Sequence, residues 1–163
     1  MPIRVVDVDF QNAAHADDFR FLLNTYACDP MGAGKSLPDE TLQALPERLA
    51  AFPTSRSIIA YADDRPAALA NCFFGFSTFA ARKLINVHDV VVLPEFRGQG
   101  ISRHLFGRIE EIANENDCCK LTLEVLEFNE TAIAAYRKFG FENYELDPAV
   151  GKALFMEKKL RPA

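Results

Sequence analysis

The chain has 163 residues, enough for one domain spanning 1–163 with a sizeable buried core. Its net charge of −5 argues against a general nucleic-acid surface, and 49% of its residues are apolar, as in soluble globular proteins. The N-terminus is charged early, and no apolar run approaches membrane-spanning length. The four cysteines lack metal-site spacing. We therefore expect a cytoplasmic protein with reduced, mostly buried thiols, no metal and no membrane partner.

The first part of the chain predicts one strand and two helices. Ile3 to Val8 reads as a strand, and the apolar spacing from Asn12 to Ala27 predicts a helix. A loop rich in Gly and Pro follows from Asp29 to Pro38. A second helix begins at Pro38 and ends before Pro53, and Pro46 inside it predicts a kink or break.

The middle of the chain predicts a hairpin, a central strand and an amphipathic helix. Ser57–Ala62 and Ala67–Phe76 are apolar runs separated by a turn, which favours a β-hairpin. Leu84–Leu93 is a long β-branched run, typical of a central strand. Gly100–Asn116 carries apolar residues on one helical face.

The last part predicts three further strands and one helix. Lys120–Leu126 alternates apolar and polar residues, and Glu130–Phe139 is a helix that ends at a glycine. Phe141–Tyr144 and Ala153–Lys159 would complete the sheet. Together the elements predict an α/β (α+β) domain with mixed strand pairing around one β-α-β unit.

A glycine-rich turn follows the central strand, at Arg97-Gly98-Gln99-Gly100-Ile101-Ser102. A strand, such a turn and then a helix N-terminus expose backbone N–H groups to an anion. A Rossmann site is an alternative, but its third glycine and spaced acidic residue are not in place. Gly32–Ser36 resembles the end of a P-loop, yet it follows a helix and lacks the earlier glycine, so we interpret it as an ordinary loop.

Two motifs in the right order resemble the GNAT superfamily of acyl-CoA N-acyltransferases. The first is Arg97 to Ser102, which is similar to the superfamily's acyl-CoA motif except that Ser102 replaces Gly or Ala. The second is Asn129, Ala132, Tyr136, Gly140 and Phe141 at the superfamily spacing. The resemblance covers Ser57 to Lys159. It implies a mixed, mostly antiparallel sheet of about six or seven strands, flanked by about four helices and splayed between the fourth and fifth strands.

The resemblance also implies acetyl-CoA as co-substrate and a set of residues that bind it. The pyrophosphate would lie on the N-terminus of the helix after the glycine-rich turn, with Arg97 as a nearby cation. The pantetheine arm would pair with the end of the central strand, and a main-chain N–H near Val92 would polarise the thioester carbonyl. The residues expected to bind the co-substrate are Val91, Val92, Leu93, Arg97, Gly98, Gln99, Gly100, Ile101, Ser102, Asn129 and Tyr136.

The resemblance places Tyr136 as general acid for the departing thiolate, although a pure packing role is an alternative. Asn129 would cap the helix that carries Tyr136, with or without a contact to pantetheine. Asp89 and His88 are the candidates for the base that deprotonates the amine, and a structural role is open for each. Neighbouring strand residues face opposite sides, so both can reach the cleft only if a bulge re-aims one of them.

The implied reaction is direct transfer of an acetyl group to a primary amine of a small molecule in a ternary complex. Phe79 and His88 are expected to line the amine site. The stretch Phe76–Phe141 looks loosely like diamine and polyamine acetyltransferases, but His88 stands where an acid is expected. The alternatives are a peptide or protein N-acetyltransferase and a non-catalytic acyl-CoA sensor. A homodimer is common in the superfamily and is a further expectation.

Overall fold

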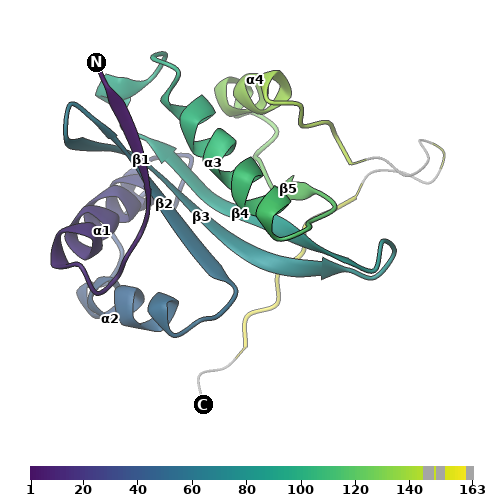
Figure 1. Ribbon diagram of the computed structural model, residues 1–163, viewed down its shortest axis with the longest axis horizontal. Coiled ribbons are helices and arrows are strands. Elements are labelled where there is room, and N and C mark those ends of the chain that lie inside the picture. Colours follow the sequence, from purple (N-terminus) through teal and green to yellow (C-terminus); the bar gives the residue numbers. More distant parts are fainter. Residues whose placement is uncertain (145–148, 150–152, 161–163) are drawn as a thin grey trace.

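The computed structural model describes residues 1–144, 149 and 153–160. In this part of the chain one sheet separates two pairs of helices, α1 with α2 on one face and α3 with α4 on the other (Figure 1). The elements are β1 (Ile3–Asp7), α1 (Ala13–Cys28), α2 (Asp39–Ala50), β2 (Ser55–Ala62), β3 (Arg65–Ser77), β4 (Arg82–Val92), a 3-10 turn (Pro94–Phe96), α3 (Ile101–Glu115), β5 (Leu121–Leu123) and α4 (Glu130–Lys138).

The strands lie in the order β1-β2-β3-β4-β5, antiparallel from β1 to β4 and parallel between β4 and β5. The predicted hairpin is therefore β2–β3, and the predicted central strand is β4. Only Ile85–Val87 of β4 pair with β5, after which the two strands separate. The predicted splay between the fourth and fifth strands is confirmed.

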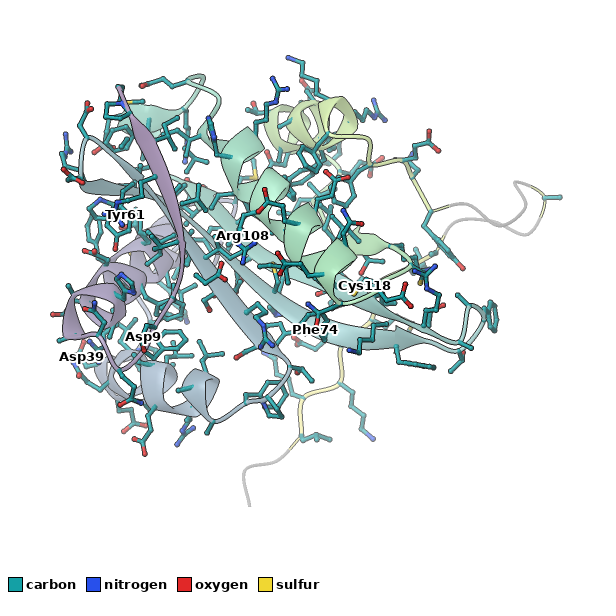
Figure 2. The ribbon with its side chains drawn as sticks, viewed as in Figure 1. Asp9, Asp39, Tyr61, Phe74, Arg108 and Cys118 are labelled. Atoms are coloured by element: carbon teal, nitrogen blue, oxygen red, sulfur yellow. The ribbon has the colours of Figure 1, made fainter. Side chains whose placement is uncertain are left out.

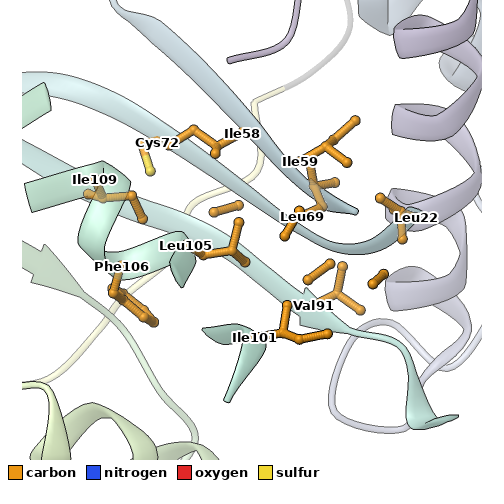
Figure 3. Close-up of a cluster of buried hydrophobic side chains, with 14 of the residues drawn as sticks. Leu22, Ile58, Ile59, Leu69, Cys72, Val91, Ile101, Leu105, Phe106 and Ile109 are labelled. Atoms are coloured by element: carbon orange, nitrogen blue, oxygen red, sulfur yellow. The ribbon is translucent and has the colours of Figure 1, made fainter. Parts of the chain in front are cut away.

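Apolar side chains from both helical layers meet the sheet. Ile101, Leu105 and Ile109 repeat every four residues along α3, and each is at most 1% exposed. Leu22 of α1 packs against the sheet from the other face (Figure 3). The predicted apolar face of the third helix is confirmed, and its packing fixes where the glycine-rich turn meets the sheet.

Arg108 ties α3 to the first strand. Its guanidinium donates to both Asp7 carboxylate oxygens, at 3.0 and 2.8 Å, and also pairs with Glu111 and Glu115 on its own helix. Figure 2 labels Arg108 on the α3 ribbon. A forked guanidinium suits this two-point contact with a carboxylate, so α3 is held in one orientation over the sheet.

Pro46 does not break the second helix, so the predicted break is absent. The α2 helix runs from Asp39 to Ala50 with Pro46 buried inside it. A proline lacks the N–H that would bond the carbonyl of Leu42, four residues earlier. Arg20 of α1 donates its Nε–H to that carbonyl at 3.1 Å instead. The tertiary contact satisfies the freed acceptor.

The C-terminal part of the predicted sheet is wrong. Phe141–Tyr144 and Ala153–Lys159 form no strand, so the described residues give a five-stranded sheet rather than six or seven strands. The fifth strand is also shorter, Leu121–Leu123 in place of Lys120–Leu126. Phe141 packs on Phe106 of α3 instead of entering a strand, with ring centroids 5.6 Å apart.

Candidate active site

The end of β4 is a strand edge that no other strand covers within the described residues. From His88 to Val92, β4 pairs only with β3. The N–H of Leu93 donates to the Ala67 carbonyl of β3 at 2.9 Å. Because successive backbone groups alternate in direction, the N–H of Val92 faces the uncovered side. This N–H can donate to an extended ligand or to a carbonyl oxygen, and its role toward the thioester stays a prediction.

A β-bulge in β4 decides where the two candidate bases point. Val87 pairs with Cys72, but Asp89 already pairs with Asn71, so His88 is the extra residue. The His88 ring meets Phe73 at 5.5 Å, and Asp89 Oδ2 accepts a hydrogen bond from Asn71 at 3.1 Å. Phe73 and Asn71 lie two residues apart on β3, so they share a face. His88 and Asp89 therefore lie on the same face of the sheet.

Two tyrosines face this region from different helices. Burial raises the pKa of Tyr26 on α1, and the charges of Asp89 and Asp29 raise it further. Burial also raises the pKa of Tyr136 on α4, with a smaller contribution from Tyr26. Tyr26 is thus within electrostatic reach of both Asp89 and Tyr136. In the sequence, Tyr26 is one of the apolar positions of the helix predicted from Asn12 to Ala27, and nothing else there marks it as a site residue.

The glycine-rich turn has the open backbone that an anion needs. Gly98 and Gly100 have φ values of +75° and +79°, and an added Cβ at either would meet nothing within 4 Å. The first turn of α3 has no side-chain cap, so its N–H groups face outward. Ile101 is buried and anchors the helix, while Ser102 is half-buried. Gln99 donates to the Glu95 carbonyl at 2.8 Å and braces the loop. These features fit the pyrophosphate of an acyl-CoA.

Arg97 bridges two parts of the site. Its Nε–H donates to the Val92 carbonyl at 3.0 Å, and its Nη2 lies 3.1 Å from Asp29 Oδ2. Asp29 also accepts from the Met31 N–H, and these two contacts lower the pKa of its carboxyl. Arg97 thus links the β4 edge to the loop between α1 and α2, and a phosphate contact for Arg97 stays a prediction.

Asn129 caps α4, since its Oδ1 accepts a hydrogen bond from the Ala132 N–H at 3.2 Å. The cap fixes the start of the helix on which Tyr136 sits. Tyr136 packs on Phe106 of α3, with ring centroids 5.5 Å apart. The cap that the sequence predicted is present, and a contact of Asn129 with pantetheine stays a prediction.

Phe79 is not brought to this site. It lies at the tip of the β3–β4 hairpin and is 99% exposed. The hairpin end lies six residues beyond Asn71 on β3, which is roughly 20 Å along a strand. A role for Phe79 in amine binding stays a prediction.

Cys72, one of the four cysteines, lies next to Asn71 on β3 and within electrostatic reach of Asp89. All four are free, but only Cys72 is buried, contrary to the expectation that most would be. Burial and, less, the charge of Asp89 raise the pKa of the Cys72 thiol to about 12, so it is not a thiolate at neutral pH. The described residues form no group of three or more metal-binding side chains, and none of their helices is long and apolar enough to cross a membrane.

Curated relatives align with part of this chain. Thialysine N-epsilon-acetyltransferase of Bos taurus is 35% identical over 71 residues, 44% of this chain and 41% of that protein. Streptothricin acetyltransferase of Streptomyces lavendulae is 37% identical over 78 residues, 48% of this chain and 41% of that protein. The chain thus spans about two fifths of the length of each.

The fold has a match over almost the whole chain. A structure of AAC(6')-Iy in complex with the bisubstrate analog CoA-S-monomethyl-acetylneamine aligns with a TM-score of 0.77, covering 98% of this chain and all of that one. The sequence identity is 18%, so this likeness concerns the fold. The sequence pattern described as "Acetyltransferase (GNAT) family" matches residues 19–141, which include both motifs. The chain belongs to the GNAT family of acetyltransferases.

Proposed function

We propose that this protein transfers an acetyl group from acetyl-CoA to the primary amine of a small molecule, by direct attack in a ternary complex. The observation that carries the proposal is the uncovered end of β4, which begins at the bulge holding His88 and Asp89 and ends at the glycine-rich turn. One ligand lying along that edge would pass the candidate bases and reach the turn. The two aligned relatives, named for thialysine and streptothricin, support a small amine as substrate.

Each step of this reaction is assigned to a side chain or backbone group of the protein. Asp89 or His88 takes a proton from the ammonium form of the amine, so that the nitrogen lone pair can attack. The N–H of Val92 donates to the thioester carbonyl oxygen as charge develops on it. The new C–N bond forms as the C–S bond breaks, and Tyr136 donates its hydroxyl proton to the sulfur. The acylated nitrogen then loses its surplus proton, which restores the Tyr136 hydroxyl and leaves the neutral amide. Acetyl-CoA, when bound, supplies the activated acetyl group.

The acid role suits the surroundings of Tyr136. Burial raises the pKa of its hydroxyl, so the proton stays on the oxygen at neutral pH. A thiolate formed next to a half-buried hydroxyl has little water to compete for that proton.

A homodimer and a cytoplasmic location stay predictions from the resemblance and from the composition.

A panel of amines tests the proposal directly. Each amine is incubated with the protein and acetyl-CoA, and the release of the free CoA thiol is followed. We expect release with small primary amines, with little or none from peptides. If acetyl-CoA binds by calorimetry but no amine releases the thiol, the acyl-CoA sensor interpretation replaces the enzyme.

A further inference from the structure

The centre of the sheet contains a row of polar side chains in an apolar setting. Among the described residues, Ser57 and Asn71 are the buried polar side chains, at 6% and 4% exposed. Their strands place them in register, Ser57 opposite Asn71 and Asn71 opposite Asp89. A buried polar group is costly unless it is hydrogen-bonded, so such a row is retained only when its members satisfy one another.

The row forms one directed chain of hydrogen bonds. The Ser57 hydroxyl donates to Asn71 Oδ1 at 2.7 Å, and Asn71 Nδ2 donates to Asp89 Oδ2 at 3.1 Å. A carboxylate can only accept, so the amide nitrogen of Asn71 must face Asp89 and its oxygen must face Ser57. The amide orientation therefore follows from both neighbours.

The hydrogen bonds of this row leave one oxygen of Asp89 without a partner among the described residues. Asp89 Oδ1 accepts no hydrogen bond from the described residues, whereas Oδ2 is held by Asn71. His88, by comparison, is exposed, and its ring makes a T-shaped contact with the Phe73 ring. Within the described part of the chain, Asp89 is the candidate base with a side-chain hydrogen-bond partner that fixes its direction, and His88 has none.

We propose that Asn71, supported by Ser57, is the positioning residue for the Asp89 carboxylate, and that Asp89 rather than His88 takes the proton of the amine. This inference rests on the proposed acetyl transfer. Held by Asn71 through Oδ2, the carboxylate leaves Oδ1 without a hydrogen bond from the described residues, and this oxygen takes the amine proton. The titratable groups around Asp89 are Tyr26 from α1, Cys72 from β3 and His88 beside it on β4.

The direct test is the titration of the Asp89 carboxyl carbon by NMR, which needs no substrate. Asn71→Leu keeps a similar volume and removes the donor. Because a donor to a carboxylate favours the charged form, we expect the Asp89 midpoint to rise by about 0.5 to 1 pH unit in this variant. Ser57→Ala should shift the Asp89 midpoint in the same direction by a smaller amount. If Asn71→Leu does not fold, the Ser57→Ala variant is measured in its place. An unchanged midpoint would overturn the positioning role.

Kinetics then separate positioning from a structural effect. With an amine that the wild type accepts, we expect Asn71→Leu to lower kcat about tenfold, with the acid limb of the pH profile displaced upward and acetyl-CoA affinity kept. In the Asp89→Asn background the same change should add less than a twofold loss. His88→Ala should lose less than threefold. Equal losses from Asn71→Leu in both backgrounds, or a larger loss from His88→Ala than from Asp89→Asn, would contradict the inference.

Cys72→Ala is the matched control, a buried neighbour of Asn71 on the same strand. It should lower thermal stability without displacing the pH profile. If the wild type releases no CoA thiol with any amine, the proposed function fails. The NMR titration still decides whether Asn71 positions Asp89.

Discussion

The two halves of β4 differ in what lies beside them. Ile85 to Val87 run between β3 and β5, and the side chains of Ile85 and Val87 are 1% and 2% exposed. The following residues, from His88 to Val92, have β3 on one side only, and most of their side chains are half-buried or exposed. The first half is part of the core, and the second is an edge.

The difference shows how one strand serves both stability and chemistry. Paired backbone has no donor left for a ligand, so the closed half contributes packing alone. In the open half the N–H of Val92 faces the gap, and the bulge at His88 brings two titratable side chains to one face. The open half also leads straight into the glycine-rich turn. Substitutions at the open half should therefore change binding and turnover, and those at the closed half should change stability.

The largest effect is expected where the open half meets α3. Gly100→Val places a β-branched residue at a φ of +79°, a conformation that such residues strongly disfavour. The first N–H groups of α3 would turn away from the anion. We expect acetyl-CoA affinity, measured by calorimetry, to fall at least a hundredfold, about 2.7 kcal/mol or more.

Gly107→Ala is the matched control for that change. Gly107 lies inside α3, where an added Cβ meets nothing within 4 Å. Alanine favours the helix, so affinity should stay unchanged and stability should rise slightly. Wild-type affinity in Gly100→Val would reject the proposed phosphate site.

The next largest effect is expected at Tyr136 on α4, the proposed general acid. Tyr136→Phe removes the hydroxyl and keeps the ring that packs on Phe106. We expect kcat to fall at least tenfold, roughly 1.4 kcal/mol of barrier, with acetyl-CoA affinity kept. Tyr144→Phe, at an exposed tyrosine that we assign no role, should leave kcat unchanged. Normal turnover in Tyr136→Phe would leave Tyr136 as a packing residue.

A smaller effect is expected at Arg97, which closes over the end of β4. Its pair with Asp29 is partly exposed, at 52% for the Arg97 side chain and 28% for that of Asp29, and should stabilise the protein by less than about 1 kcal/mol. If Arg97 also attracts the pyrophosphate, Arg97→Gln should weaken acetyl-CoA binding about three- to tenfold and reduce its dependence on salt. Asp29→Asn frees Arg97 from its partner, so it should keep or tighten binding. Identical affinity for all three proteins would confine Arg97 to a structural link.

The helices, the β4 strand as a whole and the glycine-rich turn could be predicted from the sequence, because their signals are local. The apolar periodicity of α3 and the β-branched run of β4 depend on neighbours a few residues apart. The Asn129 cap and the glycine-rich turn also follow from short motifs. These elements were found with boundaries close to those observed.

The open half depended on partners that lie far apart in sequence. The bulge at His88 is a mismatch with Asn71 and Cys72 of β3, and nothing within β4 announces it. Asn71 was a polar residue inside an otherwise apolar run, the one signal that could have marked it. The two C-terminal strands that were predicted and are not formed also depended on a partner strand far away in the sequence. Leu154, Phe155 and Met156 are apolar enough for a strand, but all three are more than 80% exposed and no strand pairs with them.

The smallest effect belongs to the closed half, at Cys72 opposite Val87. Burial, with a smaller contribution from Asp89, raises the pKa of this thiol from near 9 to about 12. The folded state therefore holds the proton more tightly than the unfolded state. This contribution to stability is complete below pH 9 and is lost as the pH rises toward 12. Between pH 9 and 10 the midpoint of urea unfolding should fall more steeply in wild type than in Cys72→Ala, because the tyrosines are common to both proteins and cancel in the comparison. Native protein should also react with a thiol reagent at the exposed Cys28 and not at Cys72. If the unfolding midpoint falls equally steeply with pH in the two proteins, or if Cys72 is labelled rapidly, the closed half is exposed to solvent as readily as the edge beside it.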